Sequence, residues 1–201
     1  MTNDTVRRCG YLALGAGVAW SATSLLSLLI DDPTRLLDVL MVAPLALTIA
    51  AFLALHRFQR DRLDRLGQWG YRLSLASFVL LVASQAVIVA GVERLYWLGF
   101  PLAAGIWFAG FLLYGIATAR AGVFAPWIGV AIAFSEVAAA LLGVAFSPIS
   151  PIADHGDYSG ALAHGLIWLA IGSALLRGHA FIANRGDASA LPSAALAASR
   201  E

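Results

Sequence analysis

The chain has no lysine, a single cysteine and few charges of either sign, and each scarcity excludes a class of function. All thirteen basic residues are arginine, so no site can use a lysine Schiff base or a phosphate-loop lysine. The lone cysteine, Cys9, excludes an internal disulfide framework. A net charge of +1 gives no reason to expect nucleic acid as a partner.

Apolar residues are what the chain has in excess. They make up 60% of the sequence, charged residues make up 12%, and the mean hydropathy is +0.80. Soluble proteins carry about a quarter charged residues and about half apolar ones. A water-soluble fold cannot hide this much apolar surface, so we expect lipid to cover it.

Six apolar stretches are long enough to cross a bilayer, whose core needs about 20 residues in helical conformation. They lie at 10–30, 36–55, 70–92, 95–118, 124–146 and 158–178. Charged or helix-breaking segments separate them, including Asp31-Asp32-Pro33 and the charged run 56–68. The sequence therefore predicts an all-α fold, a polytopic membrane bundle of six transmembrane helices in one domain at 1–178. A flexible cytoplasmic tail at 179–201 should follow, and a homo-oligomer is left open.

The arginines predict how the bundle is oriented. If the N-terminus lies inside, eleven arginines fall on the cytoplasmic side and only Arg35 and Arg94 fall outside. Positive residues favour cytoplasmic loops, so we expect a multi-pass protein of the cell membrane with both termini cytoplasmic. Anionic lipids of the inner leaflet are the expected partners of the arginine-rich loop, through Arg57, Arg60, Arg62 and Arg65.

A shift of 58 residues aligns aromatic residues at the start of the first, third and fifth helices. These residues are Tyr11, Trp69 and Trp127, and the same shift superposes Ala19, Ser77 and Ser135. The pattern predicts three tandem helical hairpins related by an axis along the membrane normal. Chance alignment of helices rich in alanine and leucine is the alternative.

Two segments carry a resemblance to known proteins. RLDRLGQWGYRLSLASF (62–78) and RAGVFAPWIGVAIAF (120–134) resemble inner loops of small six-helix membrane proteins from high-GC prokaryotes. In those proteins an R-x-G-x-x-x-x-W-x-G turn connects two helices. The resemblance implies the fold and the membrane location, but it implies no activity because those families are mostly of unknown function.

Glu136 is the residue that points most directly to function. It lies in the middle of the fifth apolar stretch, about 18 Å from its inner end at the helical rise of 1.5 Å per residue. A carboxyl at this depth is costly, so it should face the bundle interior. Similar depths are estimated for His164, Gln85 and Ser24, and the four residues could form one polar layer.

Two further patterns bear on binding and packing. Asp154, His155 and Asp157 share one outer loop and could bind a divalent cation or act as an acid–base pair, although a solvated acidic loop is the alternative. No metal-protease, serine-hydrolase or dinucleotide motif is present, so neither a metal nor a cofactor is predicted. Small residues on the fourth apolar stretch indicate close helix packing, at Gly105, Ala109, Gly110 and Gly115.

Three functions remain open from the sequence. The favoured one is binding or movement of a small molecule, ion or lipid through the polar layer around Glu136. The second is a membrane-embedded enzyme on a lipidic or isoprenoid substrate, with Glu136 and His164 as candidate catalytic groups. The third is a structural or assembly role without a ligand. Binding is favoured because one buried acid suits it, whereas an enzyme normally needs several convergent groups.

Overall fold

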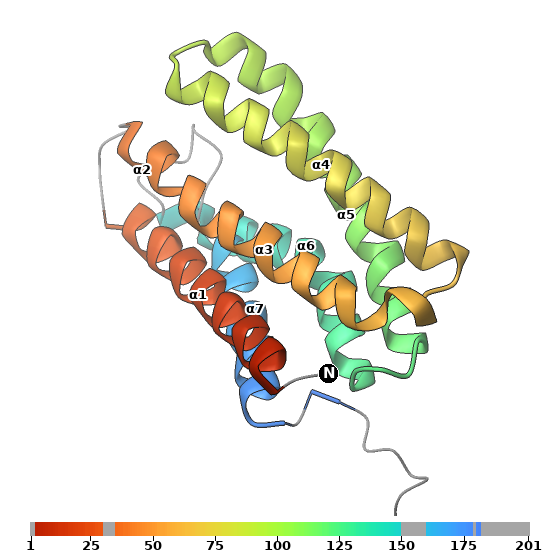
Figure 1. Ribbon diagram of the computed structural model, residues 1–201. Helices are drawn as coiled ribbons and strands as arrows, with labels where there is room; N and C mark the ends of the chain where they lie inside the picture. Colours follow the sequence, from red (N-terminus) through yellow and green to blue (C-terminus); the bar gives the residue numbers. More distant parts are fainter. Residues whose placement is uncertain (1–2, 30–34, 150–159, 179, 182–201) are drawn as a thin grey trace, which may run out of the picture.

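The computed structural model is a bundle of helices (Figure 1), and it describes residues 3–29, 35–149, 160–178 and 180–181. Its α-helices are α1 (Asn3–Ser27), α2 (Arg35–Leu40), α3 (Val42–Gln59), α4 (Arg65–Val89), α5 (Glu93–Arg120), α6 (Pro126–Phe146) and α7 (Ala161–Leu176). Two 3-10 turns, η1 (Arg60–Arg62) and η2 (Ser147–Ile149), follow α3 and α6. Within the described ranges the β-structure is limited to one isolated bridge between Phe124 and Phe181.

Five helical segments are long and apolar enough to cross a membrane. They are Asp4–Ser27, Leu36–Arg62, Arg65–Val89, Leu98–Arg120 and Pro126–Phe146. The helix α7 is equally apolar but its 16 described residues span only about 24 Å, and the predicted sixth span begins outside the described residues. Large apolar side chains such as Val79, Leu98 and Val144 are exposed on the bundle surface, as lipid contact requires. The predicted helical membrane bundle is thus confirmed.

The first inner turn is shorter than the sequence indicated. The helix α3 continues to Gln59 and into η1, and α4 begins at Arg65, so most of the charged run is helical. The carboxylate of Asp64 accepts a hydrogen bond from the backbone nitrogen of Gly67 at 2.9 Å and caps α4. Only Leu63 and Asp64 separate the helical segments, and the helix that contains the predicted span 36–55 continues to Gln59.

The helices form a ring in which α1, α3, α4, α5, α6 and α7 each pack against the next, with α7 returning to α1. Glycines bring four of these pairs into backbone contact. A Cβ atom added at Gly17 would lie 2.6 Å from the Leu169 nitrogen, and one added at Gly115 would lie 2.4 Å from the Ala133 nitrogen. Close packing is confirmed at Gly115, but it is wrong at Gly105, where a Cβ atom would meet nothing within 4 Å.

An aromatic cluster fills the middle of the bundle. The ring of Phe52 on α3 lies 5.4 Å from that of Phe78 on α4, 5.3 Å from Phe111 and 4.6 Å from Tyr114 on α5. All four side chains are buried. Trp107, one turn before Phe111 on α5, packs edge-on against both Phe78 and Phe111. Trp107 also lines the cavity described in the next subsection, so the aromatic cluster borders that cavity.

Arginines gather at one end of the bundle because successive helices alternate in direction. The start of α1 lies beside the end of α7, since a Cβ atom at Gly10 would be 2.8 Å from the Leu176 side chain. The end of α3 meets the segment just before α6 through the rings of Phe58 and Phe124. The N-terminus lies at this same end (Figure 1). The arginines here are Arg7, Arg8, Arg57, Arg60, Arg62, Arg65, Arg72, Arg120 and Arg177.

Candidate functional site

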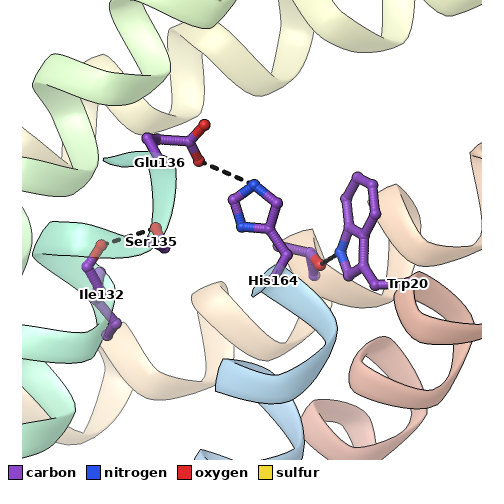
Figure 2. A network of polar contacts seen from close by, with 6 residues as sticks. Trp20, Ile132, Ser135, Glu136 and His164 are labelled. Carbon is purple, nitrogen blue, oxygen red and sulfur yellow. Dashed lines mark hydrogen bonds and ion pairs between the residues drawn. The ribbon is translucent and has the colours of Figure 1, made fainter. Parts of the chain in front are cut away.

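Glu136 and His164 meet inside the bundle (Figure 2). Glu136 lies midway along α6 and His164 lies in the first turn of α7, and His164 Nε2 is 3.3 Å from Glu136 Oε1. The side chain of His164 is 7% exposed and that of Glu136 is 18% exposed. Their helices approach closely because Gly160 has no side chain, and a Cβ atom there would be 2.5 Å from the Ala139 carbonyl oxygen.

Two tryptophans flank the His164 ring. The indole of Trp107 on α5 lies 5.5 Å from it at an angle of 23°, and that of Trp20 on α1 lies 5.4 Å away. Trp20 is fixed in turn by its Nε1, which donates a hydrogen bond to Thr48 Oγ1 on α3 at 2.8 Å. Residues of α1, α3 and α5 thus fix the position of the imidazole that α7 carries.

The pair opens on a cavity of about 470 Å³ to which every long helix contributes. Most of the wall is apolar, and the polar side chains in it are those of Gln85, Glu136 and His164, together with the indoles of Trp20 and Trp107. A concave, mainly apolar cavity with a few convergent polar groups is typical of small-molecule sites. The remaining lining residues are Met41, Leu45, Leu81, Phe100, Ala104, Ala139, Ala140, Gly143, Val144, Gly160 and Ala161.

Three buried polar atoms of the cavity residues have no hydrogen-bond partner within the described part of the chain. They are Glu136 Oε1, His164 Nδ1 and Trp107 Nε1. The approach of Glu136 to His164 is an ion-pair distance, but its geometry does not make a hydrogen bond. Native proteins rarely leave such atoms unpaired, because each costs about 1–3 kcal/mol. Three residues that line one cavity therefore carry hydrogen-bonding capacity that the described residues leave unused.

The other residues of the predicted polar layer lie in different places. Gln85 lines the cavity, and its Nε2 donates to the Asp38 backbone carbonyl at 2.5 Å, which ties α4 to α2. Ser24 is fully buried on α1, where its backbone carbonyl accepts from Ser27 Oγ, and it is not among the described residues that line the cavity. The structure thus brings Glu136, His164 and Gln85 to one cavity and leaves Ser24 outside it.

The predicted outer-loop group lies outside the described residues. It consists of Asp154, His155 and Asp157. In the described ranges, no three residues of the types His, Cys, Asp and Glu come together as a metal site would require.

Sequence reasoning missed the part that α5 plays in the site. Phe100, Ala104, Trp107, Phe111 and Tyr114 follow one another at spacings of three and four, which places them on one face of a helix. That face lines the cavity and then the aromatic cluster below it. The aromatic periodicity was the signal that could have placed Trp107 in the site.

Comparisons with models of protein families, with curated proteins and with solved structures found no match for this chain. The resemblance to small six-helix membrane proteins stays a prediction. A function must therefore be argued from the site itself.

Proposed function

We propose that this integral membrane protein binds a small amphipathic molecule in the cavity beside Glu136 and His164. The observation that carries the proposal is the set of three unpartnered polar atoms, Glu136 Oε1, His164 Nδ1 and Trp107 Nε1, on residues of one apolar cavity. The apolar walls suit a hydrocarbon body, and the three atoms suit a polar end group.

A hydroxyl fits the polar end better than a bare ion does. It can accept a hydrogen bond from Trp107 Nε1 and donate one to Glu136 Oε1, which would satisfy two of the three atoms. A hard cation takes about six oxygen ligands, and the cavity offers one carboxyl and one amide in an apolar wall. The cavity of about 470 Å³ falls in the usual range of about 300–1,000 Å³ for such ligands.

An enzyme acting on a lipidic or isoprenoid substrate is the second candidate, because Glu136 and His164 at 3.3 Å form an acid–base pair inside the same cavity. Binding, or binding coupled to movement across the membrane, is favoured because this pair is the one set of titratable groups that the described cavity holds. A structural role without a ligand would leave the three polar atoms unsatisfied.

The arginine-rich end is proposed to face the cytoplasm, with both chain termini on that side. Positive residues at one end support this orientation under the positive-inside rule. Arg57, Arg60, Arg62 and Arg65 are all exposed there, and they are proposed to contact anionic lipids of the inner leaflet.

The two tryptophans of the cavity allow a direct test. Bromoundecanol carries a hydroxyl at one end and, at the other, a bromine that quenches indole fluorescence on contact. Titrated into the protein in lipid nanodiscs, it should give saturable quenching that undecanol reverses, whereas bromoundecane should bind more weakly. The saturable part should shrink in Trp107→Phe and persist in Trp69→Phe, because Trp69 is exposed and outside the cavity. Quenching that rises linearly with the probe and ignores undecanol would contradict the proposal.

A further inference from the structure

In the half of the bundle that lies away from the arginines, direct contacts join four pairs of helices around the cavity. Gln85 ties α4 to α2 through the Asp38 carbonyl. Gly160 brings α7 against α6, and a Cβ atom at Gly165 would lie 2.8 Å from the Ser21 nitrogen on α1. Gly99 likewise brings α5 against Ser84 on α4, at 2.8 Å for its Cβ position. The boundary between α5 and α6 differs from these four.

The helices α5 and α6 cross close to their arginine-rich ends. A Cβ atom at Gly129 would lie 2.4 Å from both the Ala119 nitrogen and the Gly115 carbonyl oxygen. Further along α5, the Cβ position of Gly105 meets nothing within 4 Å. The two helices are therefore in backbone contact at one end, and the described glycines show no such contact beyond Gly115.

The exposed residues of the cavity wall all lie at this boundary. Phe100 on α5 is 38% exposed, Val144 on α6 is 76% exposed, and Ala140 on α6 is also exposed. Every other described lining residue is buried or half-buried. We call Phe100, Ala140 and Val144 the portal. Small residues, Ala104 and Gly143, line the cavity next to it.

The portal lies at the depth of the hydrocarbon. Ala140 is six residues, or about 9 Å, from the end of α6 at Phe146. Phe100 is seven residues from the start of α5 at Glu93 but only two residues, or about 3 Å, inside the apolar span that begins at Leu98. The full length of α6, about 31 Å for 21 residues, matches a hydrocarbon core of about 30 Å. Val144 is two residues, or about 3 Å, from Phe146, so the portal begins at the edge of the apolar spans and reaches about 9 Å into them at Ala140.

We infer that ligands enter the cavity sideways from the bilayer, through the portal between α5 and α6, and that they are single-chain amphiphiles dissolved in the membrane. The inference rests on the proposed function and adds to it the class of ligand and its route. A guest arriving from lipid keeps its chain among Phe100, Ala140 and Val144 while its polar end reaches Glu136 and His164. Molecules that partition mainly into water should enter poorly by this route.

The test measures rates of bromoundecanol quenching by rapid mixing with the protein in nanodiscs. Phe100→Ala widens the portal and should raise the association and dissociation rates together, the dissociation rate by more because the bound chain also loses its contact with Phe100. Ala140→Phe narrows it and should lower both rates severalfold. The matched control is Val137→Phe, since Val137 is exposed on α6 but does not line the cavity, and it should leave both rates unchanged. Bromoethanol, which stays mostly in water, should give no saturable quenching.

The outcomes separate the portal from the binding proposal. If the unmodified chain gives no saturable quenching by bromoundecanol, the proposed function fails and the portal fails with it. If quenching saturates but Phe100→Ala leaves both rates unchanged, the binding site stands and the portal is wrong, whatever Ala140→Phe does. Saturable quenching by bromoethanol would also overturn the stated ligand class.

Discussion

Glu136 lies at a depth where burying a carboxyl costs free energy, and its surroundings offset that cost only in part. An acid near the middle of a membrane costs about 2.5–3.5 kcal/mol on insertion scales. His164 at 3.3 Å supplies a partner, yet Glu136 Oε1 still lacks a hydrogen bond among the described residues. A residue kept purely to hold two helices together would be expected to satisfy both of its oxygens. The remaining capacity of Glu136 is what a ligand would use.

Glu136→Gln tests this at the level of one atom. The amide keeps the shape of the side chain, so the fold should persist with a similar unfolding temperature. Binding of bromoundecanol should weaken by up to about tenfold, because the amide can place an NH2 donor where the hydroxyl needs an acceptor and a hydrogen bond contributes about 0.5–1.5 kcal/mol. Quenching titrations measure the dissociation constant, and Ser135→Ala is the control because Ser135 Oγ donates within its own helix to Ile132. An unchanged dissociation constant would reduce Glu136 to a structural residue.

Gln59 should matter for stability instead of binding. It is 1% exposed, and its Nε2 donates to Tyr114 Oη at 2.7 Å and to Thr118 Oγ1 at 2.9 Å. Gln59→Leu removes the donor from two buried hydroxyls and should lower the free energy of unfolding by about 1–3 kcal/mol. Denaturant unfolding in detergent measures the loss. The matched change Gln68→Leu breaks one exposed hydrogen bond, to the Arg60 carbonyl, and an equal loss there would contradict this account.

At the scale of the helix, glycines decide where the bundle is tight and where it opens. Gly129→Ala places a Cβ atom 2.4 Å from backbone atoms of α5 that cannot rotate away, so it should cost roughly 1–3 kcal/mol of stability. Gly105→Ala meets nothing and removes a flexible residue from a helix, so it should be neutral or stabilise by about 0.5–1 kcal/mol. Thermal unfolding of the two variants compares them directly. A similar loss in both would argue against the tight α5–α6 crossing.

Helix positions could be predicted from the sequence because a bilayer demands about 20 apolar residues per span. The inner boundary of α3 could not, because charged residues such as Arg57 and Arg60 can continue a helix into the head-group region. Depth was also readable from the constant helical rise, which brought Glu136 and His164 to one level. Except on α5, where the aromatic periodicity marks one face, the face of each helix was not readable, because helices that are apolar all round give no polar stripe. Ser24 therefore matched in depth but lies outside the cavity wall.

At the scale of the whole molecule, the arginines at one end of the bundle predict its orientation in the membrane. Reporter fusions at the N-terminus and after Arg185 should both score cytoplasmic. A reporter inserted at Gly91, in the turn between α4 and α5, should score on the opposite side. A non-cytoplasmic signal from either terminus would reverse the proposed orientation while leaving the bundle itself intact.

The 58-residue repeat stays a prediction at this scale. Two of its aligned residues share an environment, because Ser77 and Ser135 are both buried and both donate to the carbonyl three residues earlier. A hydroxyl bonded within its own helix is also a common local feature, so the similarity does not require a repeat. Three superposable hairpins about an axis along the membrane normal remain the criterion that would establish it.

Photolabelling tests most directly whether the cavity holds an amphiphile with its polar end at Glu136 and His164. A long-chain alcohol with a photoreactive diazirine in its chain would be irradiated with the protein in nanodiscs, and the labelled residues mapped by mass spectrometry. Labels should fall on wall residues such as Leu81, Ala104 and Ala140, and excess undecanol should abolish them. Labels confined to lipid-facing residues such as Leu98 and Leu141, and unaffected by undecanol, would contradict the account.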